Sequence, residues 1–266
     1  MKRSFTNYAR IYLMMISQDF KSKMAYRADF IISTAAMVLM NFGGLASFWL
    51  IFNSIPAIKG FSYDELIFMY GFSILAATPL QLFFDNLWQL WIVTLNGDFI
   101  KYCFKPLNLF FYFVAETFDV KGLGQLLFGI ITFVYGWNRL NIPVNLTNIT
   151  MLVFSLIGAS LVLIGIMVFA SVGSFITIHG ATIMIFFIRF RDYARYPMTI
   201  FNAFFKFVFT FIIPIGFLSF YPAMFFLRPE SHLLMAFLSP VVGILIFYLA
   251  YKLWLHVATK YAGTGT

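Results

Sequence analysis

Uninterrupted apolar runs of membrane-spanning length are the feature that most constrains this sequence. The first such run extends from Phe30 to Phe52 and contains no charged residue. A helix of roughly 20 mostly apolar residues crosses the hydrocarbon core of a bilayer. Of the 266 residues, 62% are hydrophobic and 11% are charged, whereas a soluble domain carries about 25% charged residues. The chain is therefore predicted to be an all-α polytopic membrane protein with no sizeable soluble domain.

Six segments are predicted as membrane spans within a single transmembrane domain, residues 1–266. Pro56 and Gly60 mark one of the loops between them. The second and fifth predicted spans contain Pro79 and Pro214, which membrane helices tolerate when neighbouring groups satisfy the freed carbonyl. The predicted spans are residues 30–52, 66–84, 122–137, 149–176, 203–221 and 233–255.

Residues 1–27 carry apolar side chains at helical spacing together with several basic residues. Phe5, Tyr8, Tyr12 and Met15 recur on one side of the predicted helix. This pattern is typical of a helix that lies in the membrane interface, and a disordered basic tail is the alternative. The apolar core of the segment is short and lacks a small-residue cleavage site, so we expect it to be retained rather than cleaved as a signal.

Basic residues are distributed unevenly between the two sides of the predicted bundle. Fifteen lie on the side of the two termini, and three, Lys59, Arg139 and Arg228, lie on the other side. Cytoplasmic loops collect Lys and Arg, so both termini are predicted to be cytoplasmic. The fifteen are Lys2, Arg3, Arg10, Lys21, Lys23, Arg27, Lys101, Lys105, Lys121, Arg189, Arg191, Arg195, Lys206, Lys252 and Lys260.

The same count decides how the segment 178–195 is interpreted. It begins apolar and then becomes rich in arginine. An extra span at 181–188 would place the basic C-terminal tail outside, so a cytoplasmic surface helix is favoured over an additional span. The positive-inside distribution also accounts for the net charge of +8, and nucleic acid is not an expected partner.

Motifs that carry catalytic chemistry are missing from the sequence. It has no GxxxxGK[ST] phosphate loop, no HExxH and no GxSxG. One cysteine, Cys103, and three scattered histidines do not indicate a metal site. We therefore predict no catalytic residue, no metal and no cofactor bound by this chain, and the sequence does not identify substrate-binding residues.

Ionisable residues near the centres of the predicted spans would suggest transport driven by an ion gradient. Glu116 and Asp119 are the nearest candidates, and both lie at the start of the third predicted span beside Lys121. A locally paired interfacial cluster is the favoured interpretation, and a proton site is the alternative. Energy for transport is therefore expected to come from a partner.

A polar interruption at residues 85–108 is the most informative local feature. Trp88, Trp91 and Leu95 lie on one face of a helical pattern that ends at Asn96-Gly97. Glycine permits a tight turn there, Asp98 can cap the next helical turn, and a proline then ends that turn before the chain re-enters the membrane. This pattern predicts a rigid cytoplasmic element that a soluble partner could hold. A membrane-surface loop with no partner fits equally well.

Four stretches resemble one family of permeases. The segment "GDFIKYCFKPLN" at 97–108 resembles the signature G-D-F-D-x-x-L-x-K-P-L-N of ABC exporter permeases of the ABC-2 type. "RDYARYPMTIF" at 191–201 and "FTFIIPIGFLSFYPA" at 209–223 are similar to that family's later motifs, and "WLHVATKYAGTGT" at 254–266 is similar to its C-terminus. The matches are ordered and spread over nearly the whole chain, so together they point to membership.

Three positions depart from the family pattern. Ile100 replaces a frequent second aspartate, Val257 replaces a glycine and Thr266 replaces a terminal serine. They put the role of that second carboxylate in doubt without changing the resemblance. The family-motif positions expected to have structural roles are Arg195, Tyr196, Pro197, Pro214, Tyr221, Pro222, Gly263, Thr264 and Gly265.

The resemblance implies a subunit with six spans, an interfacial elbow helix at its start and a re-entrant outer segment before the last span. It implies two copies of an ABC ATPase that bind ATP and Mg²⁺, and a second permease chain, identical or homologous. Residues 85–108 would then be the coupling region, with Asp98 and Lys105 as polar contacts and Trp88 and Trp91 as apolar anchors. The residues expected at the ATPase interface are Trp88, Trp91, Asn96, Gly97, Asp98, Lys101, Lys105 and Pro106.

The predicted function is that of a multi-pass permease subunit of an ATP-driven exporter in the bacterial cytoplasmic membrane. An ion-driven secondary transporter and a non-transporting scaffold or immunity factor are the alternatives. A membrane-embedded enzyme ranks last because the sequence lacks a convergent polar constellation.

Overall fold

Four long apolar helices form the frame of the molecule. The computed structural model describes residues 5–24, 27–228 and 233–261, and within these ranges it contains helices, turns and loops but no strand. The four helices that are long and apolar enough to cross a membrane agree with four of the six predicted spans. They are α2 (Arg27–Ser54), α3 (Tyr63–Phe83), α8 (Leu146–Ser171), which α9 (Gly173–Ile176) extends, and α13 (Leu233–Ala258).

Helix α3 lies at the centre of this frame and is mostly buried, whereas most side chains of α2 and α13 are exposed or only partly buried. Close contact between helices depends on glycine. A Cβ at Gly71 of α3 would lie 2.5 Å from the backbone of Phe133, and one at Gly158 of α8 would lie 2.6 Å from Pro240 of α13. Small residues at crossings let membrane helices approach closely, since dispersion contacts rather than the hydrophobic effect drive their association.

The third predicted span corresponds to α7 (Lys121–Arg139), which packs against α2 and α3. Its buried face is rich in glycine and carries Gln125 and Thr132, so it is less apolar than the four long helices. Its opposite face exposes Leu127, Ile131 and Val134. Helix α7 thus runs beside the frame helices with an apolar outer surface.

The prediction of one continuous helical span at 203–221 is wrong. The chain forms a short α-helix and a π-helical turn, and then breaks at Ile213, whose φ and ψ of −120° and 83° are not helical. Pro214 follows, and proline disfavours the helical conformation of the residue before it. The pieces are α11 (Ala203–Phe207), η4 (Val208–Ile212), η5 (Ile215–Leu218) and α12 (Phe220–Leu227).

The prediction of a surface helix over 178–195 is also wrong. Helix α10 (Gly180–Arg189) runs back along the end of α8. The contacts show this direction: Ile183 lies against Gly173, and the ring of Phe187 lies 6.2 Å from that of Phe169. The chain continues into the bundle as η2 (Phe190–Arg195) and η3 (Met198–Ile200). Packing of the apolar residues of α10 against α8 carries the following arginines inward, which the charge count did not anticipate.

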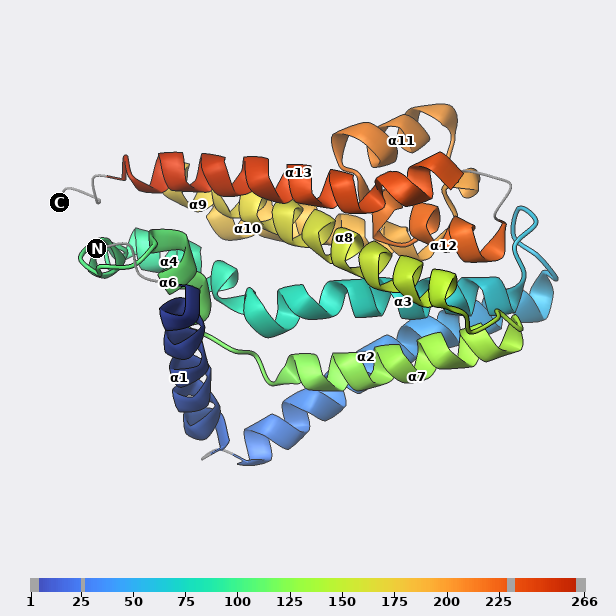
Figure 1. Cartoon of the computed structure of the whole chain (residues 1–266), viewed down its shortest axis with the longest axis horizontal. Helices are drawn as coiled ribbons and strands as arrows, with labels where there is room; N and C mark the ends of the chain where they lie inside the picture. Colours follow the sequence, from blue (N-terminus) through green and yellow to red (C-terminus); the bar gives the residue numbers. More distant parts are fainter. Residues whose placement is uncertain (1–4, 25–26, 229–232, 262–266) are drawn as a thin grey trace.

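One end of the bundle holds the non-spanning elements of residues 5–118, and we call it the inner end. Helix α1 (Phe5–Met24) lies transverse to the long helices there, as an interfacial helix was predicted to do, and the end of α13 lies nearby (Figure 1). The chain between α3 and α7 is also at this end. It comprises η1 (Asp85–Gln89), α4 (Leu90–Leu95), α5 (Ile100–Cys103) and α6 (Leu109–Ala115).

Candidate functional site

Residues 85–116 form a compact element at the inner end, which we call the inner platform. Helix α4 ends at Leu95 with Asn96 as its C-cap, and Gly97 adopts a φ of +76°, a left-handed conformation that favours glycine. The predicted tight turn at Gly97 is therefore confirmed. The predicted cap by Asp98 is wrong, because α5 begins after Phe99 and has no side-chain cap; the Asp98 side chain is exposed instead.

A buried aromatic side chain anchors the inner platform to the bundle. Phe99 is 0% exposed, and its ring lies 4.9 Å from Phe175 of α9, 6.0 Å from Trp254 of α13 and 5.5 Å from Tyr261. Phe99 is not among the residues predicted from the sequence to have a role. The sequence feature that could have identified it is an aromatic residue at the third position of the glycine-aspartate motif, directly after a turn.

Side-chain hydrogen bonds add a second connection between the platform and the long helices. The Thr94 hydroxyl donates to the Ser174 carbonyl at 2.9 Å, and the Tyr261 hydroxyl donates to the Thr94 carbonyl at 2.6 Å. Asn108 caps α6 by accepting the Phe111 N–H at 3.0 Å, and its Nδ2 donates to the Tyr251 hydroxyl of α13 at 2.9 Å. A force on the platform therefore acts on α9 and α13.

The predicted interface residues divide into two groups in the structure. Asn96, Asp98, Lys101, Lys105 and Pro106 are exposed and Gly97 is partly so; they lie on the turn at Gly97, on α5 and on the segment that follows α5. Trp88 and Trp91 are half-buried, and Trp88 packs on the core. The platform also exposes apolar side chains, of which Leu95 was predicted on the same face as the two tryptophans and the other three were not predicted: Ile92, Leu95, Ile100 and Phe104.

The two acidic candidates for an ion site lie at the inner end and have local partners. Glu116 accepts a hydrogen bond from the Tyr102 hydroxyl, and its carboxylate lies 3.7 Å from the Lys101 ammonium. Burial, and then the bond to Glu116, raise the pKa of the Tyr102 hydroxyl well above its usual range. The Asp119 carboxylate accepts from Gln81 Nε2 at 2.5 Å. This geometry agrees with the favoured interpretation of a paired interfacial cluster.

Comparison with protein-family models matches residues 38–265 to a family described as ABC-2 family transporter protein. The chain belongs to the ABC-2 transporter family. No curated protein and no solved structure matches it significantly. An ABC-2 permease is the membrane component of a transporter, is not itself catalytic and associates with an ABC ATPase.

In this ABC-2 permease, charged groups join helix α1 to the chain directly after the inner platform. Lys23 Nζ lies 2.8 Å from the Asp19 carboxylate and donates to the Phe118 carbonyl at 2.7 Å, while Asp19 accepts the Phe118 N–H at 2.8 Å. Nearby, Gln81 also donates to Asp85 at 3.3 Å. Burial, and next the charge of Asp119, raise the pKa of the Asp85 carboxyl to about 6, and neighbouring lysines oppose the shift.

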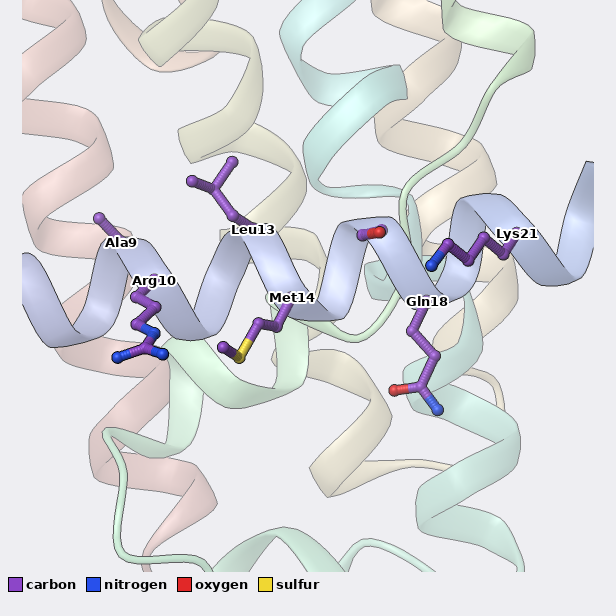
Figure 2. Close-up of a pocket in the computed structure, with 7 residues that line it drawn as sticks. Ala9, Arg10, Leu13, Met14, Gln18 and Lys21 are labelled. Atoms are coloured by element: carbon purple, nitrogen blue, oxygen red, sulfur yellow. The ribbon is translucent and has the colours of Figure 1, made fainter.

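The outward surface of α1 combines apolar and basic side chains. Leu13 and Met14 are 66% and 56% exposed. Figure 2 shows them on the helix between Arg10 and Lys21, with the rest of the bundle behind. This combination suits a helix that inserts apolar residues at the boundary of an anionic bilayer.

The later motif residues of the permease lie away from the platform. Arg195 lies over the ring of Tyr70 on α3, at 5.6 Å, and the Tyr196 ring lies 5.5 Å from that of Phe48 on α2. Pro197, Pro214, Tyr221 and Pro222 are buried. Gly263, Thr264 and Gly265 lie outside the described residues, as do residues 229–232 of the predicted re-entrant segment. Among the residues that the structure describes, no group of three His, Cys, Asp or Glu side chains could hold a metal ion.

Proposed function

We propose that this chain is the permease subunit of an ATP-driven exporter. Two permease chains, identical or homologous, form the pathway in a bacterial cytoplasmic membrane, and two ABC ATPase subunits bind ATP and Mg²⁺. The observation that carries the proposal is the inner platform. It combines a polar, exposed tip, formed by Asn96, Asp98, Lys101, Lys105 and Pro106, with a buried aromatic anchor in a chain of the ABC-2 transporter family.

Six membrane crossings account for the path of the chain. Helix α8 ends at the inner end and α13 begins at the opposite end, so the chain between them passes once through the bundle (Figure 1). We assign this fifth crossing to the broken path from α10 to α12 instead of a single helix at 203–221. With α2, α3, α7, α8 and α13, this gives six crossings and two cytoplasmic ends.

The revised path changes the charge count but not the orientation that we propose. Arg189 ends the inward-running α10, and Arg191, Arg195 and Lys206 follow it, so these four basic residues no longer belong to the inner set. Lysines and arginines of α1, the platform and the end of α13 remain there, against Lys59, Arg139 and Arg228 at the opposite end. Under the positive-inside rule the inner end is still cytoplasmic.

The platform has the connections that coupling requires. Closure of the ATPase pair around ATP would move the exposed tip, and the Phe99 ring and the Thr94–Ser174 bond would pass that motion to α9 and α8. The Asn108–Tyr251 bond would pass it to α13. The spans would then rock between inward-facing and outward-facing states, because packed helices shift as units.

The direct test is copurification with an ATPase. The chain is coexpressed with the ATP-binding subunit encoded beside it and purified by a tag on this chain, and vanadate-sensitive ATP hydrolysis is measured. We expect a stoichiometric, active complex. A permease that is stable alone and recovers no ATPase in mild detergent would contradict the proposal and favour the scaffold.

Asp98→Arg tests the platform itself. The side chain is exposed, so we expect normal insertion but loss of most bound ATPase, because a reversed charge at an interface repels the group that faced it. Asn53→Arg, in the exposed last turn of α2 at the opposite end, is the matched control and should leave the complex intact. If Asp98→Arg still forms the full complex and transports normally, the proposed role of the platform in binding the ATPase is contradicted.

The ion-driven alternative is tested by Glu116→Gln and Asp119→Asn. Both carboxylates have partners at the inner end rather than at mid-span. We expect transport to depend on ATP and to survive both substitutions. Transport that needs either carboxylate but no ATP would favour the ion-driven carrier.

A further inference from the structure

A polar cleft lies inside the bundle between α2, α3, α7 and η2. Its polar lining includes Asn41, Tyr70 and Gln125, together with the charged residues of η2. Asn41 is at the middle of the 28-residue α2. Helix α10 separates η2 from the inner end by ten residues, or about 15 Å of helix. The cleft is therefore well inside the membrane-spanning part of the molecule.

The charges in the cleft do not balance. Arg195 donates from Nη2 to the Asp192 carboxylate at 2.6 Å and from Nε to the Asp192 carbonyl at 2.9 Å. Arg191 also lines the cleft and is half-buried. Among the described residues, no hydrogen bond or ion pair to Arg191 is present. Two arginines and one aspartate leave one positive charge in excess at membrane depth, where an unpaired charge is costly and is a sign of function.

The surroundings hold the arginine pair in place. Gly44 of α2 lies so close that a Cβ there would collide with the Tyr70 hydroxyl and approach Arg195 Nη1 to 3.2 Å. The Tyr70 hydroxyl donates to the Asn41 carbonyl at 2.9 Å. Ala194, between the two arginines, is completely buried, and its carbonyl accepts the Ser219 hydroxyl. The segment that carries the arginines is thus fixed within the bundle instead of lying on its surface.

The size of the cleft limits what it can hold. Its volume is about 40 Å³, enough for a few water-sized groups but far below the roughly 300–1,000 Å³ of a pocket for a drug-sized ligand. A charged head group fits this volume, whereas an apolar tail does not. The tail of such a molecule would have to remain in the surrounding apolar layer.

We propose that Arg191, held beside Arg195 in this cleft, binds the anionic head group of an amphipathic molecule within the membrane. A phosphate or a carboxylate accepts the forked N–H donors of a guanidinium and neutralises the excess charge. The head group could belong to a membrane lipid or to the transported molecule. The second assignment rests on the proposed exporter function and narrows its substrate to anionic amphiphiles.

The test compares two probes with the same tail and opposite head groups. The chain alone, in phosphatidylcholine nanodiscs and labelled at its exposed single cysteine, Cys103, is titrated with dodecyl phosphate and with dodecyltrimethylammonium. Thermophoresis measures each dissociation constant. We expect dodecyl phosphate to bind about tenfold more tightly or better. Equal binding of the two probes contradicts the proposal, and this arm requires no substitution in the site.

Substitutions then locate the site. Arg191→Gln should weaken dodecyl phosphate binding about tenfold, because a charge-assisted contact is lost, and Arg191→Lys should recover most of the affinity. Arg189→Gln is the matched control, since Arg189 is exposed and two residues away. Thermal melting of each variant verifies folding. Equal losses in Arg191→Gln and Arg189→Gln would place the anion elsewhere.

A final arm separates the two sources of the head group. Nanodiscs that contain phosphatidylglycerol should lower the apparent affinity for dodecyl phosphate if a lipid occupies the cleft and leave it unchanged if lipids are excluded. Stimulation of the purified ATPase complex by dodecyl phosphate, lost in Arg191→Gln, would make the amphiphile a substrate. If the chain binds the anion but recovers no ATPase, the proposed anion site is supported and the proposed exporter function is contradicted.

Discussion

The inner platform and the segment 180–227 are both interruptions of an apolar chain by charged residues, glycine and proline, but they have opposite structures. The platform turns its charged side chains outward and its aromatic anchor, Phe99, inward. The segment 180–227 turns Arg191 and Arg195 inward, toward the cleft. The two regions differ in their surroundings: the platform lies at the end of the bundle, whereas the segment 180–227 lies against α3 and α8. A polar interruption thus acquires its role from its neighbours.

The two regions also differ in backbone continuity. The platform begins with the 3₁₀ helix η1 and continues in short α-helices with a defined turn and a capped α6. The segment 180–227 includes 3₁₀ turns, a π turn and the break before Pro214. Short 3₁₀ and π elements often occur at functional sites. We therefore expect the platform to move as a rigid unit and the segment 180–227 to change its local conformation more easily. The following predictions test that difference.

Phe99→Ala should have the largest effect. The side chain is fully buried among aromatic rings, and truncation of a buried phenylalanine costs about 3–5 kcal/mol. We expect a strongly lowered melting temperature and loss of monodisperse protein in detergent. Phe104→Ala, on an 81% exposed residue of the same platform, should change little. If both variants melt alike, the platform is not anchored as described.

Gly44→Val tests the close packing around Arg195. A Cβ at Gly44 would meet Tyr70 and Arg195, whereas the adjacent Gly43 has nothing within 4 Å. Overpacking typically costs about 1–3 kcal/mol, so Gly44→Val should lower the melting temperature while Gly43→Val leaves it nearly unchanged. Similar melting of the two variants would mean that the arginine region adapts freely.

Tyr261→Phe removes the hydroxyl that joins the end of α13 to α4. The bond to the Thr94 carbonyl measures 2.6 Å, and a typical hydrogen bond contributes about 1 kcal/mol. We expect a small loss of stability and a larger loss of transport per ATP hydrolysed, because the platform is less tightly coupled. Tyr248→Phe, at a 52% exposed position of α13, is the control. Unchanged coupling in Tyr261→Phe would exclude this hydroxyl from the transmission and leave it to Phe99 and the Thr94–Ser174 and Asn108–Tyr251 bonds.

Asp85→Asn should have the smallest effect, and the effect depends on pH. The folded-state pKa of Asp85, about 6, lies above the usual aspartate value of 3.8, so ionisation of the carboxyl disfavours the folded state. The variant should be more stable above pH 6, by at most about 1 kcal/mol after allowance for solvent screening. This advantage should disappear as pH falls toward 4. Melting curves of both proteins across this range measure it; a constant difference would contradict the shifted pKa.

Local sequence signals predicted the long helices well. Apolar runs located α2, α3, α8 and α13 to within a few residues, and Asn96-Gly97 located the platform turn because a left-handed φ selects glycine. The polar tip of the platform followed from composition. In contrast, the pattern at 203–221 predicted a span because hydropathy does not detect the break before Pro214.

The sequence by itself determined membrane embedding, the ordered motifs of an ABC-2 permease and the location of the platform, since length, hydropathy and turn chemistry are local properties. Only the tertiary structure decided that Phe99 is the anchor and that Arg191 lines an internal cleft. Their partners, Trp254 for Phe99 and Asn41 and Tyr70 for the cleft, are far away in the sequence. Burial and charge balance depend on those distant neighbours, which no local pattern contains.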